Sequence, residues 1–200
     1  MRTGGVIGVY DPRMRAFLDF EASSLSDDSY PIEVAWVFED GTGESYLIRP
    51  VDGWTNWRAT AEAVHGIERS RLFNEGTSVG VVAARMIESL TGHVLAASAP
   101  VWDGRWMSVL MRAAGQPADA LHLTGTEDLI AQSVASILGE KLPASAVPDV
   151  AGRVMRALDA IERPAPAHRA MADALAERQR WQAACDLAAA ERTSWVPPGR

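Results

Sequence analysis

Residues 16–22 read Ala-Phe-Leu-Asp-Phe-Glu-Ala, a short apolar and aromatic stretch that contains two carboxylates. This composition is typical of a buried β-strand. Because strand side chains alternate between two faces, Asp19 and Glu21 project from one face, roughly 7 Å apart, and Leu18 and Phe20 project from the other. Two buried carboxylates repel each other and lose hydration, which predicts a cation between them. The alternative is a strand end where both acids are hydrated or cap a turn.

A third acid, Asp103, ends another apolar run, in which a strand is expected over residues 94–101. Apolar side chains recur at the spacing of one helix face after Asp103, which predicts a helix over 103–114 with these inward residues: Trp106, Met107, Leu110 and Met111. Asp103 is therefore expected at a strand-to-helix junction. The alternative role for an aspartate at that position is a helix N-cap.

Two prolines in Arg163-Pro-Ala-Pro-Ala167 mark the start of a last helix, expected over residues 168–192. His168 and Asp173 lie five residues apart, about 140° around a helix axis. If His168 occupies the first turn, both side chains face one cavity, where Asp173 binds a metal and His168 takes a proton from water. The alternative is an ordinary solvated helix surface.

Three segments, Phe17-Leu-Asp-Phe-Glu21, Ala99-Pro-Val-Trp-Asp103 and His168-Arg-Ala-Met-Ala-Asp173, together resemble the motifs of the DEDD exonuclease family in its histidine variant. A fourth, Glu62-Ala-Val-His65-Gly-Ile67, is similar to the His-Gly-Ile segment between that family's first and second motifs. The second motif departs from the family pattern at residues 98–99, where Ser-Ala stands in place of the His-Asn of many relatives.

The resemblance implies a ribonuclease-H-like α/β fold, in which a mixed central sheet of about five strands is flanked by α-helices. It implies two Mg²⁺ or Mn²⁺ ions, about 4 Å apart, held by four carboxylates: Asp19, Glu21, Asp103 and Asp173. One ion then lowers the pKa of a bound water, His168 acts as the general base, and the other ion stabilises the leaving 3′ oxygen. The implied activity is 3′–5′ exonucleolytic release of nucleoside 5′-monophosphates. A homodimer is also plausible by resemblance alone.

Five further residues are candidates for contact with the nucleic acid. Ser23 and Ser24 follow the first motif and offer hydroxyls or backbone amides to a terminal nucleotide, and His65 is expected to line the substrate groove. Arg105 and Arg169 each stand beside a motif residue and are candidate phosphate contacts. The alternatives are turn formation for the serines and His65, and ordinary surface positions for the arginines.

The length of 200 residues fits one domain. We expect an exonuclease domain at 14–192, a loose tail or an added strand at 1–13 and a disordered tail at 193–200. The lone Cys185 excludes an internal disulfide and a thiolate metal cluster. No apolar run approaches the ~18 residues that cross a membrane, and the first residues do not fit a signal peptide. A cytoplasmic enzyme is therefore expected.

The net charge of −7 argues against a protein that grips long nucleic acid through its phosphates. Two divalent ions would match four of the acids, and a short single-stranded 3′ end needs few phosphate contacts. Short single-stranded RNA or a short oligonucleotide is therefore the expected substrate. The alternatives are a catalytically idle binding or regulatory module on the same fold, a two-metal hydrolase of small phosphodiesters, and a ribonuclease-H-type endonuclease, against which the His168–Asp173 pair argues.

The remaining pattern predicts the order of the other elements. Two more strands, at 31–38 and 45–50, are joined by the turn Asp40-Gly41-Thr-Gly43. Residues 54–75 show no clear period. Further along, the sequence predicts helices at 76–91, 127–138 and 149–161 and a short strand at 120–123. Three successive strands followed by alternating strands and helices indicate a mixed sheet.

Overall fold

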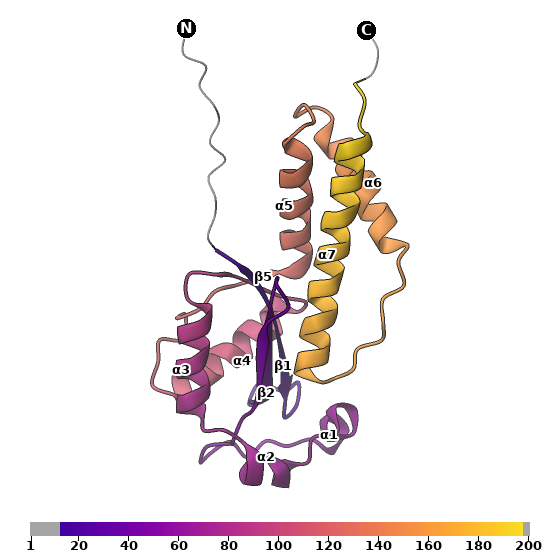
Figure 1. Cartoon of the computed structure of the whole chain (residues 1–200). Coiled ribbons are helices and arrows are strands. Elements are labelled where there is room, and N and C mark those ends of the chain that lie inside the picture. The colour runs from indigo at the N-terminus through magenta and orange to yellow at the C-terminus, as the bar shows by residue number, and fades with distance from the viewer. Residues whose placement is uncertain (1–12, 198–200) are drawn as a thin grey trace, which may run out of the picture.

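A mixed five-stranded sheet lies at the centre of the computed structural model, which describes residues 13–197 (Figure 1). Its strand order is β3-β2-β1-β4-β5. The strands are β1 (Arg15–Ala22), β2 (Pro31–Phe38), β3 (Gly43–Leu47), β4 (Val94–Ala97) and β5 (Leu123–Gly125). The first three strands pair antiparallel, whereas β1, β4 and β5 run parallel. The predicted mixed sheet is therefore confirmed.

Helices cover both faces of this sheet. They are α1 (Ala59–His65), α2 (Arg69–Glu75), α3 (Val79–Leu90), α4 (Pro100–Ala113), α5 (Thr126–Gly139), α6 (Val147–Asp159) and α7 (Ala170–Ser194). Helices α3 and α4 pack on one face, and α5, α6 and α7 on the other (Figure 1). Within the part of the chain that the structure describes, no helix combines the length and apolarity needed to cross a bilayer.

The two predicted tails are only partly covered by the structure. Of the expected N-terminal tail or added strand at 1–13, residues 1–12 lie outside the described residues, as do residues 198–200 of the expected C-terminal tail. Helix α7 continues to Ser194, two residues into the segment predicted to be a tail.

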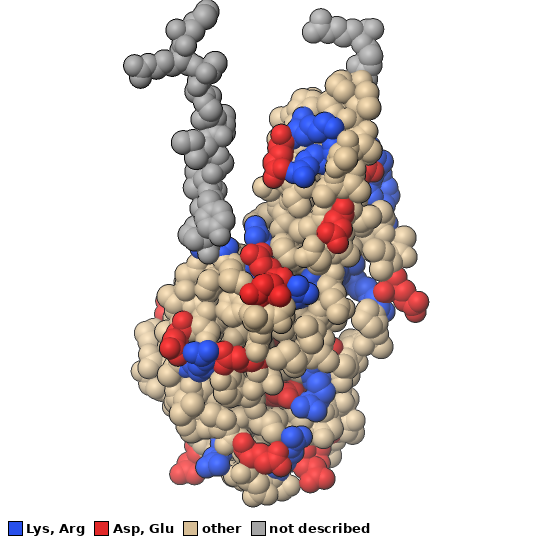
Figure 2. Space-filling view, viewed as in Figure 1, with Lys and Arg blue, Asp and Glu red and all other residues tan. Residues whose placement is uncertain are grey.

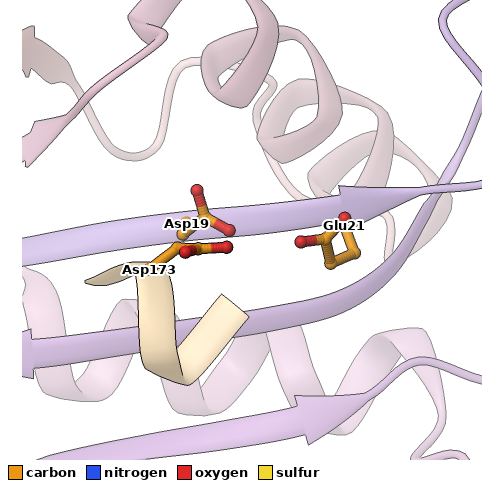
Figure 3. A group of neighbouring side chains, drawn as sticks. All are labelled: Asp19, Glu21 and Asp173. Carbon is orange, nitrogen blue, oxygen red and sulfur yellow. The ribbon is translucent and has the colours of Figure 1, made fainter. Parts of the chain in front are cut away.

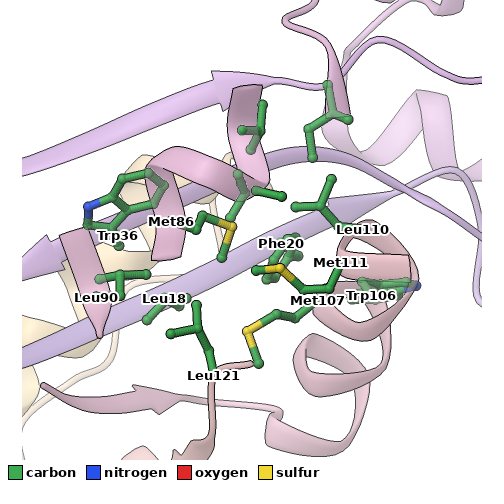
Figure 4. Packing of buried hydrophobic residues seen from close by; sticks show 14 of the residues in the cluster. Leu18, Phe20, Trp36, Met86, Leu90, Trp106, Met107, Leu110, Met111 and Leu121 are labelled. Atoms are coloured by element: carbon green, nitrogen blue, oxygen red, sulfur yellow. The ribbon is translucent and has the colours of Figure 1, made fainter. Parts of the chain in front are cut away.

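Alternation along β1 separates an apolar face from an acidic one, as its sequence predicts. Leu18 and Phe20 are buried against α3 and α4 (Figure 4). On the opposite face, Phe17 packs on Trp181 of α7 with ring centroids 5.6 Å apart, and Asp19 follows two residues later. The strand that carries the first two acids is therefore clamped by packing on both of its sides.

The boundary between β4 and α4 differs from the prediction. The strand ends at Ala97 and the helix begins at Pro100, so Asp103 lies inside the first turn of α4 and not at the junction itself. A proline fixes φ near −65° and lacks the N–H that a first helical residue leaves unused, which explains the earlier start. The short fifth strand is likewise Leu123–Gly125 and not 120–123.

Residues 54–75, which showed no clear period, contain α1 and α2. Each has seven residues, too few to repeat an apolar spacing twice. Gly66 ends α1 with φ 68°, a left-handed conformation that favours glycine. Ile67 and Leu72 are fully buried against Tyr30 and Ile32, so this segment closes the end of the sheet beside the last residues of β1.

Gly76, between α2 and α3, is packed too closely for any side chain. A Cβ there would lie 2.3 Å from the Leu72 carbonyl oxygen and 2.7 Å from the Arg49 nitrogen. We expect Gly76→Ala to lower the free energy of unfolding by about 2 kcal/mol in urea titrations, because the backbone must shift. Gly80→Ala is the matched control: the site is exposed in α3 with no atom within 4 Å, so a gain of about 0.5–1 kcal/mol is expected. Equal losses in both variants would contradict this account.

Candidate active site

A cavity of about 670 Å³ lies where the end of β1 meets α1 and the first turns of α7. Its polar lining comes from segments far apart in the sequence and includes Asp19, Glu21, Ser24, His65, His168, Asp173 and Glu177. Its size is that of a pocket for a small organic ligand or a nucleotide. The fold therefore brings together most of the residues that the three motifs single out.

Three carboxylates from two elements converge in this cavity (Figure 3). Asp19 and Glu21 project from the same side of β1, and Asp173 approaches them from the first turn of α7. One oxygen from each of the three side chains lies within 4.8 Å of the others. Oxygen atoms at this spacing are the ligands that a hard cation such as Mg²⁺ or Mn²⁺ prefers.

Asp103 approaches the same group from α4, below the surface of the cavity. It is 2% exposed, and its Oδ1 accepts a hydrogen bond from the Phe20 N–H at 3.2 Å, midway between Asp19 and Glu21 along the strand. β4 pairs with β1 only as far as Phe17. Beyond that point, the Asp103 side chain replaces β4 as the hydrogen-bond acceptor for the backbone of β1. Among the described residues, its buried Oδ2 has no hydrogen-bond partner, which fits an oxygen that ligates a cation.

Burial and mutual repulsion raise the pKa values of three of these acids. Burial, followed by the charge of Asp103, raises the pKa of Asp19 to about 9. Burial, followed by the charge of Asp173, raises the pKa of Glu21 to about 7. Burial also raises the pKa of Asp103 to about 7, although backbone N–H groups that include Phe20 oppose it. Carboxylates this costly to ionise together are the expected surroundings of a divalent cation.

The His168–Asp173 spacing has a local cause that differs from the predicted helical one. His168 precedes α7, is exposed, and has φ 53°, so it is not in the first turn of the helix. The Asp173 carboxylate accepts hydrogen bonds from the backbone N–H groups of the two residues that flank His168, from Ala167 at 2.8 Å and from Arg169 at 3.2 Å. The Asp173 carboxylate thus closes the turn that contains His168, so the position of the histidine depends on Asp173.

The structure gives Arg169 a different role from the predicted phosphate contact. Its guanidinium binds the Glu33 carboxylate through two hydrogen bonds of 2.7 and 3.1 Å. Glu33 is 4% exposed on β2 and also accepts from the Ala170 N–H at 3.0 Å. Arg169 is therefore already neutralised, and it anchors the start of α7 to the sheet.

Ser23 and Arg105 also lie outside the cavity. Ser23 is fully buried, and its hydroxyl accepts from the Tyr30 N–H at 3.1 Å, as expected for a residue that closes a turn. Arg105 pairs with Asp27, donating both to the carboxylate at 3.1 Å and to the backbone carbonyl. Ser24 does line the cavity, and its hydroxyl donates to the Asn56 side chain at 2.8 Å.

His65 both closes a turn and lines the cavity, so the two roles considered for it coexist. Its Nδ1 accepts from the Ile67 N–H at 3.0 Å, which places the proton of a neutral ring on Nε2. Burial lowers the pKa of the imidazole and so favours this neutral form. Within the described residues, Nε2 is buried and has no partner. It is therefore a donor available to a bound molecule.

A fifth carboxylate, Glu177, was missed in the sequence. It stands one helical turn after Asp173 and lines the same cavity. Burial raises its pKa, and its charge contributes to the raised pKa values of Asp19 and Asp103. The signal for it was the four-residue spacing from Asp173, which places two side chains on one face of a helix.

Solved structures share this fold. The zinc-bound complex of E. coli ExoI with single-stranded DNA superposes with a TM-score of 0.58 at 19% identity, covering 84% of this chain and 39% of that one. E. coli exonuclease I bound to a dT13 oligonucleotide gives 0.59 at 17% identity, covering 84% and 40%. The chain thus spans about two fifths of the length of these structures. They confirm the predicted ribonuclease-H-like fold class. No protein-family model and no curated protein sequence matches the chain.

We expect the metal-free protein to lose stability as pH rises, and Asp19→Asn to reduce that loss. An unfolded aspartate titrates near pH 3.9, whereas the pKa of Asp19 in the fold is about 9. Between these values the unfolded chain releases a proton that the native protein keeps, so the free energy of unfolding falls with pH by up to about 1.4 kcal/mol per unit. Asparagine removes this titration and one charge from the cluster.

The measurement is Tm against pH from 4 to 9 in EDTA, where the Asp19→Asn profile should be the shallower. Asp52→Asn, at an exposed position outside the cavity, is the matched control and should follow the native protein. Parallel profiles for Asp19→Asn and the native protein would rule out a strongly raised pKa at Asp19.

Proposed function

We propose that this protein is a metal-dependent 3′–5′ exonuclease that acts on single-stranded nucleic acid, with its catalytic domain in residues 14–192. The observation that carries the proposal is that Asp19, Glu21 and Asp173 converge in one cavity beside His168, while Asp103, from a third segment, is buried next to them against β1. The shared fold supports it, because the E. coli exonuclease I structures of the same fold hold single-stranded DNA.

The four carboxylates are the proposed ligands of two Mg²⁺ or Mn²⁺ ions. The raised pKa values of Asp19, Glu21 and Asp103, and the Oδ2 of Asp103 without a hydrogen-bond partner among the described residues, are the features of the site that a bound cation would stabilise. Bound there, divalent ions supply a more acidic water and offset the negative charge that develops on the leaving oxygen. The chain's contribution is to hold the ligands in place: β1 is packed on both faces, and Asp103 is tied to its backbone.

His168 is the proposed general base. It is exposed at the edge of the cavity, so the proton that it takes from the attacking water passes readily to solvent. The two hydrogen bonds to Asp173 hold the backbone on both sides of it, which limits the orientations of the ring. An imidazole in such a position can accept a proton from a water molecule in the cavity.

The other walls of the cavity are the proposed contacts for the terminal nucleotide. The polar groups there are the Nε2–H of His65 and Ser24, whose hydroxyl proton is donated to Asn56, so that Ser24 can contact a nucleotide only by giving up that bond. Ala61 and Val64 of α1 give the same wall an apolar surface, on which the face of a base can pack and bury apolar area. Ser23, Arg105 and Arg169 are not assigned substrate contacts, because the structure engages them elsewhere.

The test is a denaturing gel with short 5′-labelled single-stranded DNA and RNA, each incubated with Mn²⁺, Mg²⁺ or EDTA. A metal-dependent ladder that shortens from the 3′ end would support the exonuclease, and the faster substrate would identify the sugar preference. Internal cuts would instead indicate an endonuclease. Intact oligomers together with turnover of small phosphodiesters would indicate a hydrolase of small substrates, and no turnover of any kind would indicate an idle module.

We expect Asp103→Asn to lose both activity and metal binding, and His168→Ala to lose activity alone. Asp103→Asn removes a ligand charge, so it should abolish turnover and weaken the rise in Tm that Mg²⁺ or Mn²⁺ gives the native protein. His168→Ala should lower kcat by about 10²–10⁴-fold and leave that rise intact, because a general base is not a ligand. Near-normal activity in Asp103→Asn would remove Asp103 from the site. Loss of the metal-dependent rise in His168→Ala would make His168 a ligand.

A further inference from the structure

Arg58 is a cation of the cavity that the proposed roles leave unused. It immediately precedes α1, its side chain is exposed, and it lines the same cavity as the carboxylates. Among the residues that the structure describes, its guanidinium forms no hydrogen bond and no ion pair. An arginine in an otherwise acidic cavity is therefore free to meet an anion.

The arginines around the site are, by contrast, matched by acids. Each forms an ion pair with a nitrogen–oxygen distance of 2.6–3.1 Å, and the pairs are Arg169–Glu33, Arg105–Asp27, Arg163–Glu127 and Arg180–Glu127. On the face shown in Figure 2, basic side chains likewise lie beside acidic ones and do not gather in one patch. Unpaired positive charge near the cavity is therefore scarce, so the position of the Arg58 guanidinium indicates where an anion can bind.

The backbone of Arg58 is held firmly beside the end of β1. Its N–H donates to the Ser23 carbonyl oxygen at 3.1 Å, two residues after Glu21. Its own carbonyl oxygen accepts from the N–H groups of Ala61 and Glu62, each at 3.0 Å. The buried Ser23 thus links Arg58 to the strand that carries the first two acids, so the base of this side chain is fixed relative to the carboxylates.

We propose that Arg58 binds a phosphodiester group of the substrate strand on the 5′ side of the scissile linkage. This inference rests on the proposed function. A strand whose terminal phosphodiester lies among the carboxylates must carry its next phosphate to another part of the cavity, because the four proposed ligands already match the charge of two divalent ions and Glu177 adds a further negative charge. The α1 side of the cavity offers Arg58, and a guanidinium binds two phosphate oxygens at once.

A structural role for this guanidinium is poorly supported by its surroundings. The charge of Arg58 contributes least among the causes that lower the pKa of Asp28, after hydrogen bonds from Ser26 and Asn56. Asp28 is itself fully exposed and already bonded by those two side chains. The interaction with Asp28 therefore leaves Arg58 available to a ligand.

The test is fluorescence anisotropy with a labelled single-stranded DNA that carries 3′-terminal phosphorothioate linkages to slow hydrolysis, titrated at several salt concentrations. We expect Arg58→Ala to weaken binding about tenfold at low salt. Its plot of log K against log salt should be shallower by about 0.7, the contribution of one phosphate contact to a single strand. Arg58→Lys should keep the native slope, because it keeps the charge.

Arg71→Ala is the matched control: it removes the same charge from α2, outside the cavity, and should bind like the native protein. An unchanged slope in Arg58→Ala, or an equal loss in Arg71→Ala, would overturn the proposal. The proposed function fails if the native protein never degrades an oligonucleotide. Arg58 is still a phosphate contact in that case, provided that the slope for Arg58→Ala is shallower than the native slope by the expected amount. If the native protein does not bind the DNA, both fail.

Discussion

The start of α7 depends on one buried carboxylate, Glu33 of β2, and the arrangement of the site depends on that start. Glu33 lies opposite Glu21 in the register of β1 and β2, and it accepts hydrogen bonds from the Arg169 side chain and the Ala170 N–H. Arg178 ties the helix to the sheet again through the Phe38 and Glu39 carbonyl oxygens. A helix fixed at two points has little freedom to slide, so Asp173 stays over β1.

Strand β1 has an apolar face that stabilises the fold and an acidic face that costs stability. Leu18 and Phe20 are buried among apolar side chains of α3 and α4, which stabilises β1. Asp19 and Glu21, on the other face, have raised pKa values because they are buried and face further acids. Packing on the apolar face therefore offsets the electrostatic cost of the acidic face, as is common where side chains are arranged for chemistry and not for stability.

Apolar and polar alternation in the sequence predicted those strands and side-chain orientations that depend on neighbouring residues alone. The alternation of Asp19 and Glu21 with Leu18 and Phe20 follows from strand geometry, and β2 spans the predicted residues 31–38. The start of α4 was misplaced because Asp103 was taken as the junction, although Pro100 is the residue that begins the helix. Arg169 was predicted to contact phosphate because it stands beside a motif residue. Its partner Glu33 lies 136 positions away, a separation at which periodicity carries no information.

The arrangement of the charges makes the net charge of −7 compatible with the proposed nuclease of short single strands. Acids gather inside one cavity, while arginines around it are engaged in ion pairs such as Arg169–Glu33 and Arg105–Asp27. A long polyanion would find few free cations on the described part of the chain, so phosphate neutralisation contributes little to affinity there. Under the proposed function, binding is then concentrated where cations, the His65 donor and Arg58 meet the last nucleotides. The proposed function therefore predicts that the protein recognises the end of a strand and not its length.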